Sequence, residues 1–457
     1  MAMVVKNNMS ALSTLNTLNK NTNALSKSLQ KVSSGMKINS AADDASGYAI
    51  SERMRVQIRS LDQANSNAQN GGSMMKVAEG AVSSTVEILK TLKEKAVNAA
   101  NDTNTDADRA TIQKELDQSI DQINDNANVT FNGQYLVDGS KNSETTATTT
   151  VMTNQNLSTE TLSTTSMTDL AARNGDKLNI HSTDTITVSY VQDGKTHTSS
   201  VKLDASGGVN NLGDVSDMTL GKIISVLTEG KVKISANSEN SDIDEANKGA
   251  SSFIGVDGSG NSVYTASGES GISVVANDSG IDNQISGFTI SVTDNTGAVN
   301  KSANAALDAF EEQIRAQNES VDNSIVMQVG TKANQSIKVG LTDMKAQALG
   351  LQGKDGETLS VGNQEKANAA INVLDAAIQK ALDQQTTIGA VESRLEYTQS
   401  NLTTASENVT AAESVIRDAD MAKEMTEYTK NNVLMQAAQS MLAQANQSSS
   451  NALSLLQ

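Results

Sequence analysis

The chain has 457 residues, with 35 basic and 53 acidic side chains and a formal net charge of -18 at pH 7. Its lack of cysteine excludes disulfides, thiolate metal sites and cysteine nucleophiles together. The acidic balance argues against a nucleic-acid partner, because phosphate contacts need clustered Lys and Arg. No run approaches the ~18 consecutive apolar residues of a membrane span or the ~7–15 of a signal-peptide core. We therefore expect no membrane partner, and a chain that is either cytoplasmic or exported without a cleaved signal.

Long apolar seams predict helices on the N-terminal side. Between Met9 and Met36, apolar or neutral residues alternate by four and three, the heptad spacing of helices that pack on other helices. Gly35 is placed to cap this first helix. We expect two further helices over about 44–70 and 73–100, with a glycine pair at 71–72 ending the first of them. A fourth helix carries Ile112, Leu116, Ile120, Ile123 and Ala127.

The middle of the chain predicts strands instead. Thr185–Val191 alternates with period two and is followed by Asp193-Gly194, which together are a strong hairpin signal. Further strands at 272–275 and 288–292 and a short helix at about 219–227 make residues 143–300 one β-rich domain or two small ones. A helix at 303–317 then returns the chain to helical sequence. After it, the segments 324–329 and 336–341 predict a second hairpin.

Serine and threonine dominate residues 143–168, where they make up 15 of 26 positions. The plainest interpretation is a solvated linker. The sharper alternative is an exposed surface that carries dense O-glycosylation. The candidate O-glycosylation residues are Thr148, Thr149, Thr150, Ser163, Thr164 and Thr165.

The C-terminal side has the longest seam. Every seventh residue from Leu374 to Ile416 is apolar, and a companion seam runs from Ala370 to Ala412, which predicts a very long helix. A last helix has Leu434, Ala438, Met441 and Ala445 on one stripe. Because the small Ala and Ser side chains bury little area, we expect the terminal stripes to pack between molecules.

Catalytic motifs are nearly absent. His181 and His197 stand 16 residues apart in strand-like sequence, and neither lies in a metal-binding helix motif. No G-x-S-x-G elbow is present, and the glycine-rich run at 256–260 lacks the Lys of a phosphate loop. We expect no enzyme, no catalytic residue, no cofactor and no metal site.

One segment resembles a known family. Residues 32–50 read V-S-S-G-M-K-I-N-S-A-A-D-D-A-S-G-Y-A-I, which is similar to the N-terminal signature of bacterial flagellins, with Val32 in place of Leu. Residues 65–71, 79–81 and 131–133 and the ending A-L-S-L-L at 452–456 also match the family. The resemblance covers about 1–142 and 321–457, whereas the middle carries only a weak similarity to a small repeat module of some flagellar proteins. The signature residues are Ser34, Gly35, Ile38, Asn39, Asp43, Asp44 and Gly47.

The resemblance implies a fold and a function. We expect a mainly α protein with a β-rich insertion, in which both chain ends form a long antiparallel helical rod. Residues 1–42 with 418–457 would form the filament core, 43–142 with 321–417 a helical rod domain with a small hairpin, and 143–320 a variable surface domain. Such a protein self-assembles into the helical flagellar filament used for swimming. The expected subunit-packing residues are Leu15, Leu18, Leu25, Leu29, Val32, Leu434, Met441, Leu442, Leu453 and Leu456.

The resemblance also implies partners and a location. Besides further copies of itself, we expect flagellar cap and hook-junction proteins, the flagellar export apparatus, and an export chaperone at the C-terminal helix. The protein would be extracellular, after export through the flagellar secretion channel without a cleaved signal peptide.

The family's site for the animal flagellin-sensing toll-like receptor is altered. That site reads approximately Q-R-x-R-E-L-A-V-Q, whereas residues 90–98 here read K-T-L-K-E-K-A-V-N. Thr91 replaces a guanidinium and Lys95 replaces an apolar Leu, so we expect weak or absent activation of the receptor. The receptor-site equivalents are Lys90, Thr91, Lys93, Glu94, Lys95 and Glu115.

Three rivals compete with the filament subunit. A hook–filament junction protein shares the terminal helices, although the run at 43–50 and the A-L-S-L-L-Q ending favour the filament protein. A metalloprotease variant needs H-E-x-x-H, which neither histidine supplies. An adhesive role for residues 143–320 has no positive support in the sequence.

Overall fold

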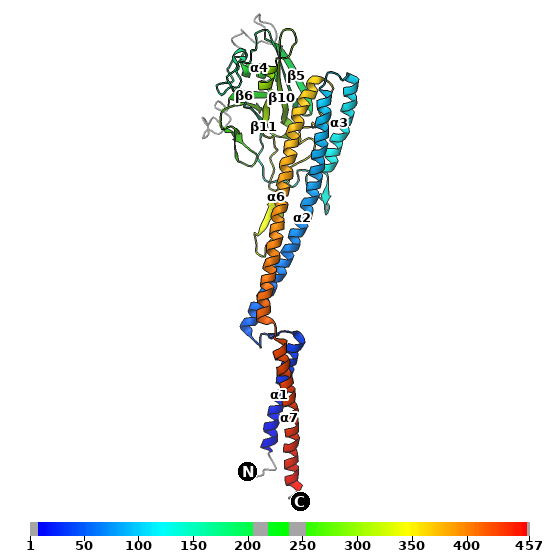
Figure 1. Ribbon diagram of the computed structural model, residues 1–457, viewed down its shortest axis with the longest axis vertical. Helices are drawn as coiled ribbons and strands as arrows, with labels where there is room; N and C mark the ends of the chain where they lie inside the picture. The colour runs from blue at the N-terminus through cyan, green and yellow to red at the C-terminus, as the bar shows by residue number, and fades with distance from the viewer. Residues whose placement is uncertain (1–7, 204–217, 237–252, 455–457) are drawn as a thin grey trace. The chain divides into compact units, whose positions relative to one another are not determined.

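The computed structural model describes residues 8–203, 218–236 and 253–454. Along the chain, helical segments precede and follow a β-rich middle (Figure 1). This confirms the predicted fold class. The helices are α1 (Met9–Ser34), α2 (Ala45–Ala99), α3 (Asp106–Ala127), α4 (Leu220–Leu227), α5 (Lys301–Leu307), α6 (Gln364–Arg417) and α7 (Met421–Ser454). Two 3-10 turns are η1 (Met167–Asp169) and η4 (Ile281–Asn283). None of these described helices combines the length and apolarity needed to cross a membrane.

The described strands form small antiparallel sheets. They are β1 (Thr130–Phe131), β2 (Gln134–Tyr135), β3 (Val151–Asn154), β4 (Thr185–Gln192), β5 (Lys195–Lys202), β6 (Val232–Ala236), β7 (Phe253–Val256), β8 (Ser262–Tyr264), β9 (Ile272–Ala276), β10 (Ile285–Thr293), β11 (Phe310–Ile314), β12 (Ile325–Gln328) and β13 (Ser336–Val339). The two larger sheets have the strand orders β11-β3-β9-β6 and β10-β4-β5. The hairpins β1-β2, β7-β8 and β12-β13 pair separately.

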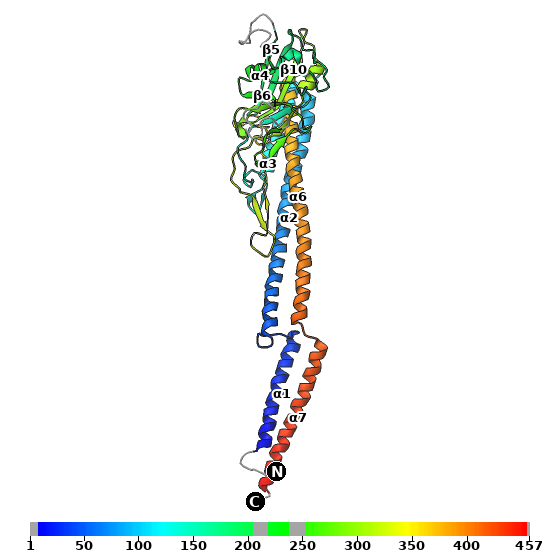
Figure 2. The same ribbon diagram turned by 90° about the vertical axis from the view of Figure 1, so that its left-hand side faces the viewer.

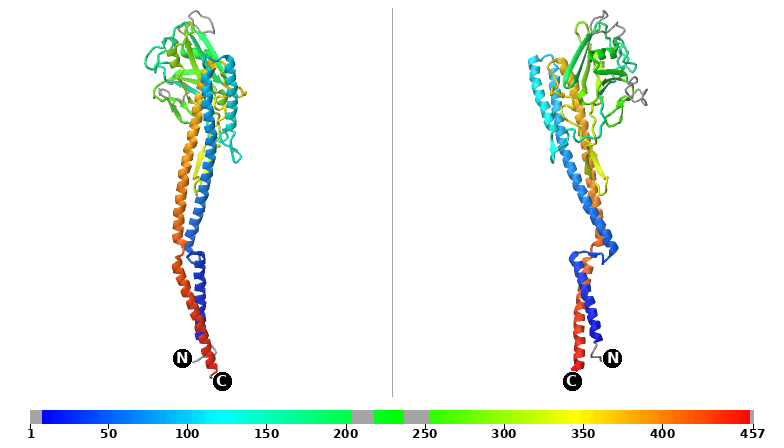
Figure 3. Two further views of the ribbon diagram at one scale, coloured as in Figure 1. Left: turned by 45° about the vertical axis from the view of Figure 1, so that its right-hand side comes forward. Right: turned by 180° about the vertical axis from the view of Figure 1, so that it is seen from behind.

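The chain divides into two compact units. The terminal unit comprises Met1–Gln69, Gln328–Ser336 and Glu396–Gln457, and the central unit comprises Asn70–Met327 and Ile337–Leu395. Within the terminal unit, α1 and α7 lie side by side and run antiparallel (Figure 2). Within the central unit, α3 lies along α2 (Figure 3), where the Asn126 amide donates to the Ser84 hydroxyl at 3.1 Å.

The helical seams of the central unit are buried as their heptad spacing predicts. Met75, Val82 and Leu89 on α2 are fully buried, as are Leu374 and Leu395 on α6. Further along α6, in the terminal unit, the seam residues at 402, 409 and 416 are only half-buried. The heptad pattern therefore continues past the point where the chain itself covers it.

The glycine pair at 71–72 does not end a helix, so that prediction is wrong. Helix α2 runs unbroken through it. A Cβ at Gly71 would lie 2.3 Å from the Met327 sulfur and 3.6 Å from a Leu395 methyl. Gly71 therefore serves close packing on the hairpin β12-β13, whereas Gly35 ends α1 in the left-handed conformation as predicted (φ 71°).

The β-rich region has one principal core. Apolar side chains from β4, β9, β10, α4 and α5 belong to a single buried cluster that extends from Met152 to Leu307. Within this cluster Phe288 meets Phe310 edge to face, with ring centroids 5.1 Å apart. The structure thus favours one domain over two.

Two predictions for the middle are wrong. The segment 143–168 is not a linker, because it contains β3, whose four residues are all buried between β11 and β9. The expected helix at 303–317 is the seven-residue α5 followed by β11, which pairs with β3. Both errors concern segments whose burial depends on pairing with distant strands.

Candidate subunit interface

Polar bonds, rather than a buried core, join α1 to α7. The Asn8 amide donates to the Ala445 carbonyl at 3.2 Å, the Asn21 amide donates to the Leu434 carbonyl at 3.2 Å, and the Asn431 amide donates to the Ser28 hydroxyl at 3.1 Å. Among the side chains that the structure describes on these two helices, only Ser28 and Ala438 are buried. Side chains this small remove little apolar surface from water.

Large apolar side chains stay exposed on the same helices. On α1, Leu12 is 51% exposed, Leu15 is 41% exposed and Leu29 is 51% exposed. On α7, Leu434 is 42% exposed and Met441 is 63% exposed. A helical repeat of 3.6 residues puts the three leucines of α1 on one side of that helix.

Four of the predicted packing residues are therefore exposed, namely Leu15, Leu29, Leu434 and Met441. Four others are half-buried, namely Leu18, Leu25, Val32 and Leu442. The side chain of Leu453 and the whole of Leu456 lie outside the described residues.

The signature residues build the turn between α1 and α2. The Asp43 carboxylate accepts from the backbone N–H groups of Asn39 and Ser40, both at 3.1 Å. These bonds, first that of Ser40, lower the pKa of Asp43. Asp44 accepts from the N–H groups of Ser46 and Gly47 at the start of α2, where an anion is favoured.

Close packing and a further hydrogen-bonding residue also stabilise this turn. A Cβ on Gly47 would lie 2.4 Å from an Asp44 carboxylate oxygen and 2.7 Å from the Ile38 methyl, so a larger residue here would displace both side chains. Ile38 is itself buried, at 5% exposed. The Ser34 hydroxyl donates to the Lys31 carbonyl at 3.3 Å and accepts from the Met36 N–H at 3.2 Å near the end of α1. Through these contacts the signature residues stabilise the turn between α1 and α2.

Arg417, which the sequence analysis did not single out, joins the four helix ends of the terminal unit. Its guanidinium donates to Glu52 on α2 at 2.7 Å and lies 5.6 Å from the centre of the Tyr48 ring. This hydrogen bond is the main cause of the lowered pKa of Glu52. Backbone bonds Lys37 N–H to Arg417 O (2.8 Å) and Ala419 N–H to Gly35 O (2.9 Å) fix the α6–α7 joint against the α1–α2 turn.

The receptor-site equivalents lie on α2 and α3 with several of their charges already paired. Lys95 bonds to Glu115 at 2.9 Å, Lys90 bonds to Glu87 at 2.7 Å, and Lys93 bonds to Asp375 of α6. Thr91 donates its hydroxyl to the Glu87 carbonyl at 3.1 Å. Glu94 is exposed.

The glycosylation candidates differ in accessibility. Thr148 and Thr150 are buried, and the Thr148 hydroxyl donates to the Arg315 carbonyl at 2.6 Å. For these two residues the prediction of an exposed sugar carrier is wrong, because folding hides both hydroxyls. Thr149, Ser163 and Thr165 are half-buried, and Thr164 is exposed.

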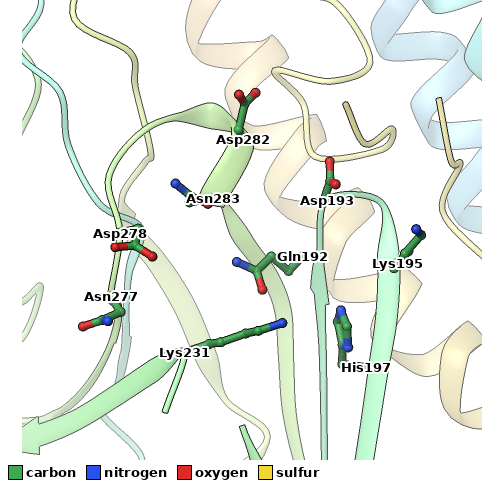
Figure 4. A pocket seen from close by; sticks show the side chains of 9 residues that line it. All are labelled: Gln192, Asp193, Lys195, His197, Lys231, Asn277, Asp278, Asp282 and Asn283. Carbon is green, nitrogen blue, oxygen red and sulfur yellow. The ribbon is translucent and has the colours of Figure 1, made fainter. Parts of the chain in front are cut away.

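A polar pocket of about 360 Å³ lies in the β-rich region, and His197 is one of the nine residues that line it (Figure 4). Burial and the nearby Lys231 lower the pKa of His197, whose ring stacks on Tyr190 at 5.1 Å. His181 is remote from the lining, with a side chain 75% exposed. Within the described ranges no group of three or more His, Cys, Asp or Glu is arranged to hold a metal ion.

Terminal helices α1 and α7 whose described side chains bury little between them, in a chain with a β-rich core elsewhere, are features found in subunits that assemble with their copies. Residues 5–142 match the bacterial flagellin N-terminal helical region, and residues 371–456 match the bacterial flagellin C-terminal helical region. The chain is 34% identical to a flagellin of Clostridium tyrobutyricum over 97% of this chain and 99% of that protein. It is 30% identical to flagellin C of Vibrio cholerae over the full length of both.

Among solved structures, the chain is similar to flagellar hook associated protein-3 of Legionella pneumophila, with 15% identity and a TM-score of 0.33. That alignment covers 79% of this chain and 97% of the other.

The chain belongs to the bacterial flagellins. It is thus a structural subunit of the extracellular flagellar filament, the helical assembly used for swimming.

Proposed function

We propose that α1 and α7 form the inner contacts between copies in the filament. The observation that carries this proposal is the exposure of Leu12, Leu15 and Leu29 on a helix pair in which, among the described side chains, Ser28 and Ala438 alone are buried. In this arrangement residues 1–42 with 418–457 line the core, 43–142 with 321–417 surround them, and 143–320 face the medium.

The energetics support contacts between molecules. Full burial of one Leu side chain contributes about 1.5–3 kcal/mol. Within one chain the exposed leucines of the α1–α7 pair do not contribute this stabilisation. In the filament they contribute it when a neighbouring copy buries them. Repeated head-to-tail contacts that do not close on themselves then generate a helical polymer. In the free subunit, helices with so little burial are marginal and become ordered on assembly.

Export precedes assembly in this proposal. The subunit passes unfolded through the flagellar secretion channel without a cleaved signal, and a chaperone shields the exposed apolar residues of α7. Hook-junction and cap proteins contact the same terminal helices at the two ends of the filament. An export assay with the last helix deleted tests the chaperone contact, since the deletion should abolish chaperone binding.

Receptor activation is weak in this proposal. The threonine at 91 cannot make the bidentate contacts of a guanidinium, and the ion pair of Lys95 with Glu115 occupies both groups. A reporter-cell assay on purified monomer checks this. Signalling as strong as that of a known activator would contradict it.

Glycosylation, if the organism adds it, is expected at exposed hydroxyls such as that of Thr164. Intact-mass and peptide mass spectrometry of native filaments tests this expectation. Sugar found on Thr150, which is 0% exposed, would show that attachment precedes folding.

Cryo-electron microscopy of polymer grown from seeds tests the main proposal. We expect helical tubes in which α1 and α7 are the innermost elements and Leu29 contacts another copy. A protein that stays monomeric with intact termini would instead favour the junction protein, which is present in few copies and does not polymerise alone.

A further inference from the structure

A second pocket, which we call the acidic pocket, lies in the central unit between β11 and α6. Its lining includes Phe310, Glu311, Glu312 and Arg315 from β11 and its end, and Asp375 and Ile378 from α6. Its volume of about 520 Å³ lies within the range of small-molecule sites, roughly 300–1,000 Å³. The pocket is therefore large enough for a small ligand or for a side chain of another molecule.

Glu312 is the buried acid of this pocket. Its side chain is 8% exposed, and its Oε1 atom has no hydrogen-bond partner among the described residues. The Oε2 atom lies 3.8 Å from the Nε atom of Arg315, which is too far for a hydrogen bond. Burial raises the pKa of Glu312, and the nearby Arg315 and Lys380 oppose this effect only in part. A buried carboxylate oxygen without a donor is costly, and a ligand that donates to it removes this cost.

The strand is irregular where Glu312 leaves it. The pairing of β11 with β3 shifts register between Glu312 and Ile314. An irregularity of this kind re-aims the neighbouring side chains and is common beside binding sites. Ile314 is buried in a small apolar cluster with Val151 and Ile254, whereas Glu312 lines the acidic pocket.

The lining carries an excess of negative charge. The carboxylates of Glu311, Glu312 and Asp375 stand against the single guanidinium of Arg315. Asp375 pairs with Lys93 of α2. Glu311 is exposed and makes no ion pair with any described residue. The pocket thus presents one buried and one exposed carboxylate that lack a close cationic partner.

The excess persists when neighbouring charges are included. Arg315 donates to Asp383 at 2.9 Å, so its charge is shared with a second carboxylate. Lys380 donates to the Ala348 carbonyl at 2.7 Å and is itself influenced by Asp343. The lining and these neighbours together hold five carboxylates against three cationic groups, namely Glu311, Glu312, Asp343, Asp375 and Asp383 against Lys93, Arg315 and Lys380. A concave region with this excess attracts cations.

Apolar side chains form another part of the wall. Phe310 and Ile378 are half-buried and line the pocket. The Phe310 ring is held by its edge-to-face contact with Phe288, at 5.1 Å between centroids. An aromatic ring attracts a cation, and the methylene groups next to an ammonium group pack well on apolar surface.

We propose that the acidic pocket binds an alkylammonium group. An ammonium group has three N–H donors and no acceptor, which matches a pocket whose unpaired groups include carboxylate oxygens. A metal ion fits less well, because within the described ranges no group of three or more His, Cys, Asp or Glu is arranged to hold one. The ammonium group belongs either to a free aliphatic amine or to a lysine side chain of a neighbouring copy.

NMR titration of unpolymerised full-length protein, labelled at the phenylalanine rings, tests the proposal. The probe is n-butylammonium chloride, with n-butanol as the neutral comparator, sodium butyrate as the anionic one, and constant ionic strength. We expect n-butylammonium to bind at least about tenfold more tightly than either comparator. It should shift the ring signal of Phe310 and leave that of Phe131 in β1 unchanged, which is readable because the chain has only four phenylalanines.

Matched variants locate the binding. Glu312→Gln should weaken n-butylammonium binding about tenfold or more and Asp375→Asn about threefold, because each removes a carboxylate from the lining. Glu319→Gln makes the same change of net charge at an exposed position outside the lining and should bind as wild type. Circular dichroism confirms that each variant folds.

The proposal is overturned if n-butanol or butyrate binds as tightly as n-butylammonium, if the Phe310 signal does not respond, or if the three variants bind alike. Seeded filaments then separate the two sources of the ammonium group. Binding that persists in the filament assigns the pocket to a free amine, whereas binding lost on polymerisation assigns it to a lysine of a neighbouring copy. The monomer titration does not depend on polymerisation, so it can fail or succeed independently of the proposed filament contacts.

Discussion

The α1–α7 pair leaves large apolar side chains exposed to solvent, whereas the β-rich region buries them. In the pair, leucines such as Leu12 and Leu29 are half exposed while the described buried positions are Ser28 and Ala438. In the β-rich region, Phe288 and Ile290 are almost completely buried in one cluster. Apolar side chains exposed to water raise the free energy of the folded chain, whereas buried ones lower it.

This difference separates two kinds of stability. A region with its own core folds at any protein concentration, whereas a helix pair with a polar seam depends on what covers its apolar side. The two regions should therefore respond independently to mutation, one through unfolding and the other through polymerisation.

The largest effect is expected in the core of the β-rich region. Phe288→Ala should lower the free energy of unfolding of this region by about 4 kcal/mol, because it leaves a cavity beside Phe310. Urea unfolding of the monomer measures this value. The critical concentration for polymerisation should stay within about threefold of wild type.

Val299→Ala is the matched control, since Val299 is 57% exposed and its truncation should cost under about 0.5 kcal/mol. A comparable loss in both variants would mean that Phe288 does not anchor a core. A large polymerisation defect in Phe288→Ala would show that the two regions are coupled.

The opposite response is expected on α1. Leu29→Asp should raise the critical concentration about a hundredfold, equivalent to roughly 3 kcal/mol, because it places an unpaired charge in a contact between copies. Monomer unfolding should change by less than about 0.7 kcal/mol, the difference in helix propensity. Sedimentation of seeded polymer gives the critical concentration.

Ser13→Asp introduces the same charge on the opposite side of α1, at an exposed position. It should polymerise nearly as wild type. Equal defects in the two variants would point to net charge rather than to the apolar side of the helix.

Sequence periodicity predicted the helices well where it reports burial. The seams at 75–99 and 374–395 are buried as expected, because a heptad repeat records which side of a helix faces another helix. It failed at Gly71, where the lack of a side chain makes room for Met327, a residue 256 positions away in the chain. A single sequence does not distinguish a helix breaker from a close contact.

The middle of the chain was harder for a different reason. Thr150 and Thr153 are buried in or beside β3, yet hydropathy reads a threonine-rich run as exposed. Their burial depends on hydrogen bonds such as that from the Ile285 N–H to the Thr150 hydroxyl, made across 135 residues. Long-range pairing of this kind leaves no local pattern.

The candidate sites divide in the same way. The positions of the α1 leucines on one side of the helix could be predicted from their spacing alone. The polar pocket, in contrast, is formed by three distant segments, and the joint at Arg417 is formed by four helix ends. Chemistry assembled by tertiary contacts appears only once the topology is known.

A half-buried ammonium group offers a smaller test, in the central unit. Lys380 donates to the Ala348 carbonyl at 2.7 Å, and burial lowers its pKa to about 8, with Glu312 nearby. Between pH 8 and the unfolded value near 10.5 the unfolded state binds more protons, so stability from this group rises with pH across that window.

Lys380→Met should remove that rise. The difference in unfolding free energy between wild type and variant should change by about 2 kcal/mol between pH 7.5 and 10, a figure reduced for the partial solvent access of the side chain. Urea titrations at several pH values measure it. Lys338→Met, at an exposed lysine paired with Asp322, should show no comparable pH dependence.

The smallest effect is expected at the one ion pair described between α1 and α7. The Lys31 ammonium lies 3.6 Å from the Glu424 carboxylate, and pairs this open to water contribute about 0.5 kcal/mol. Glu424→Gln should therefore raise the critical concentration no more than about threefold, and added salt should mask even that change. A tenfold or larger shift would mean that the chain's own charges, rather than the apolar sides of its helices, hold the pair in place. That result would remove the contrast with the β-rich region, because both would then be stabilised chiefly within one molecule.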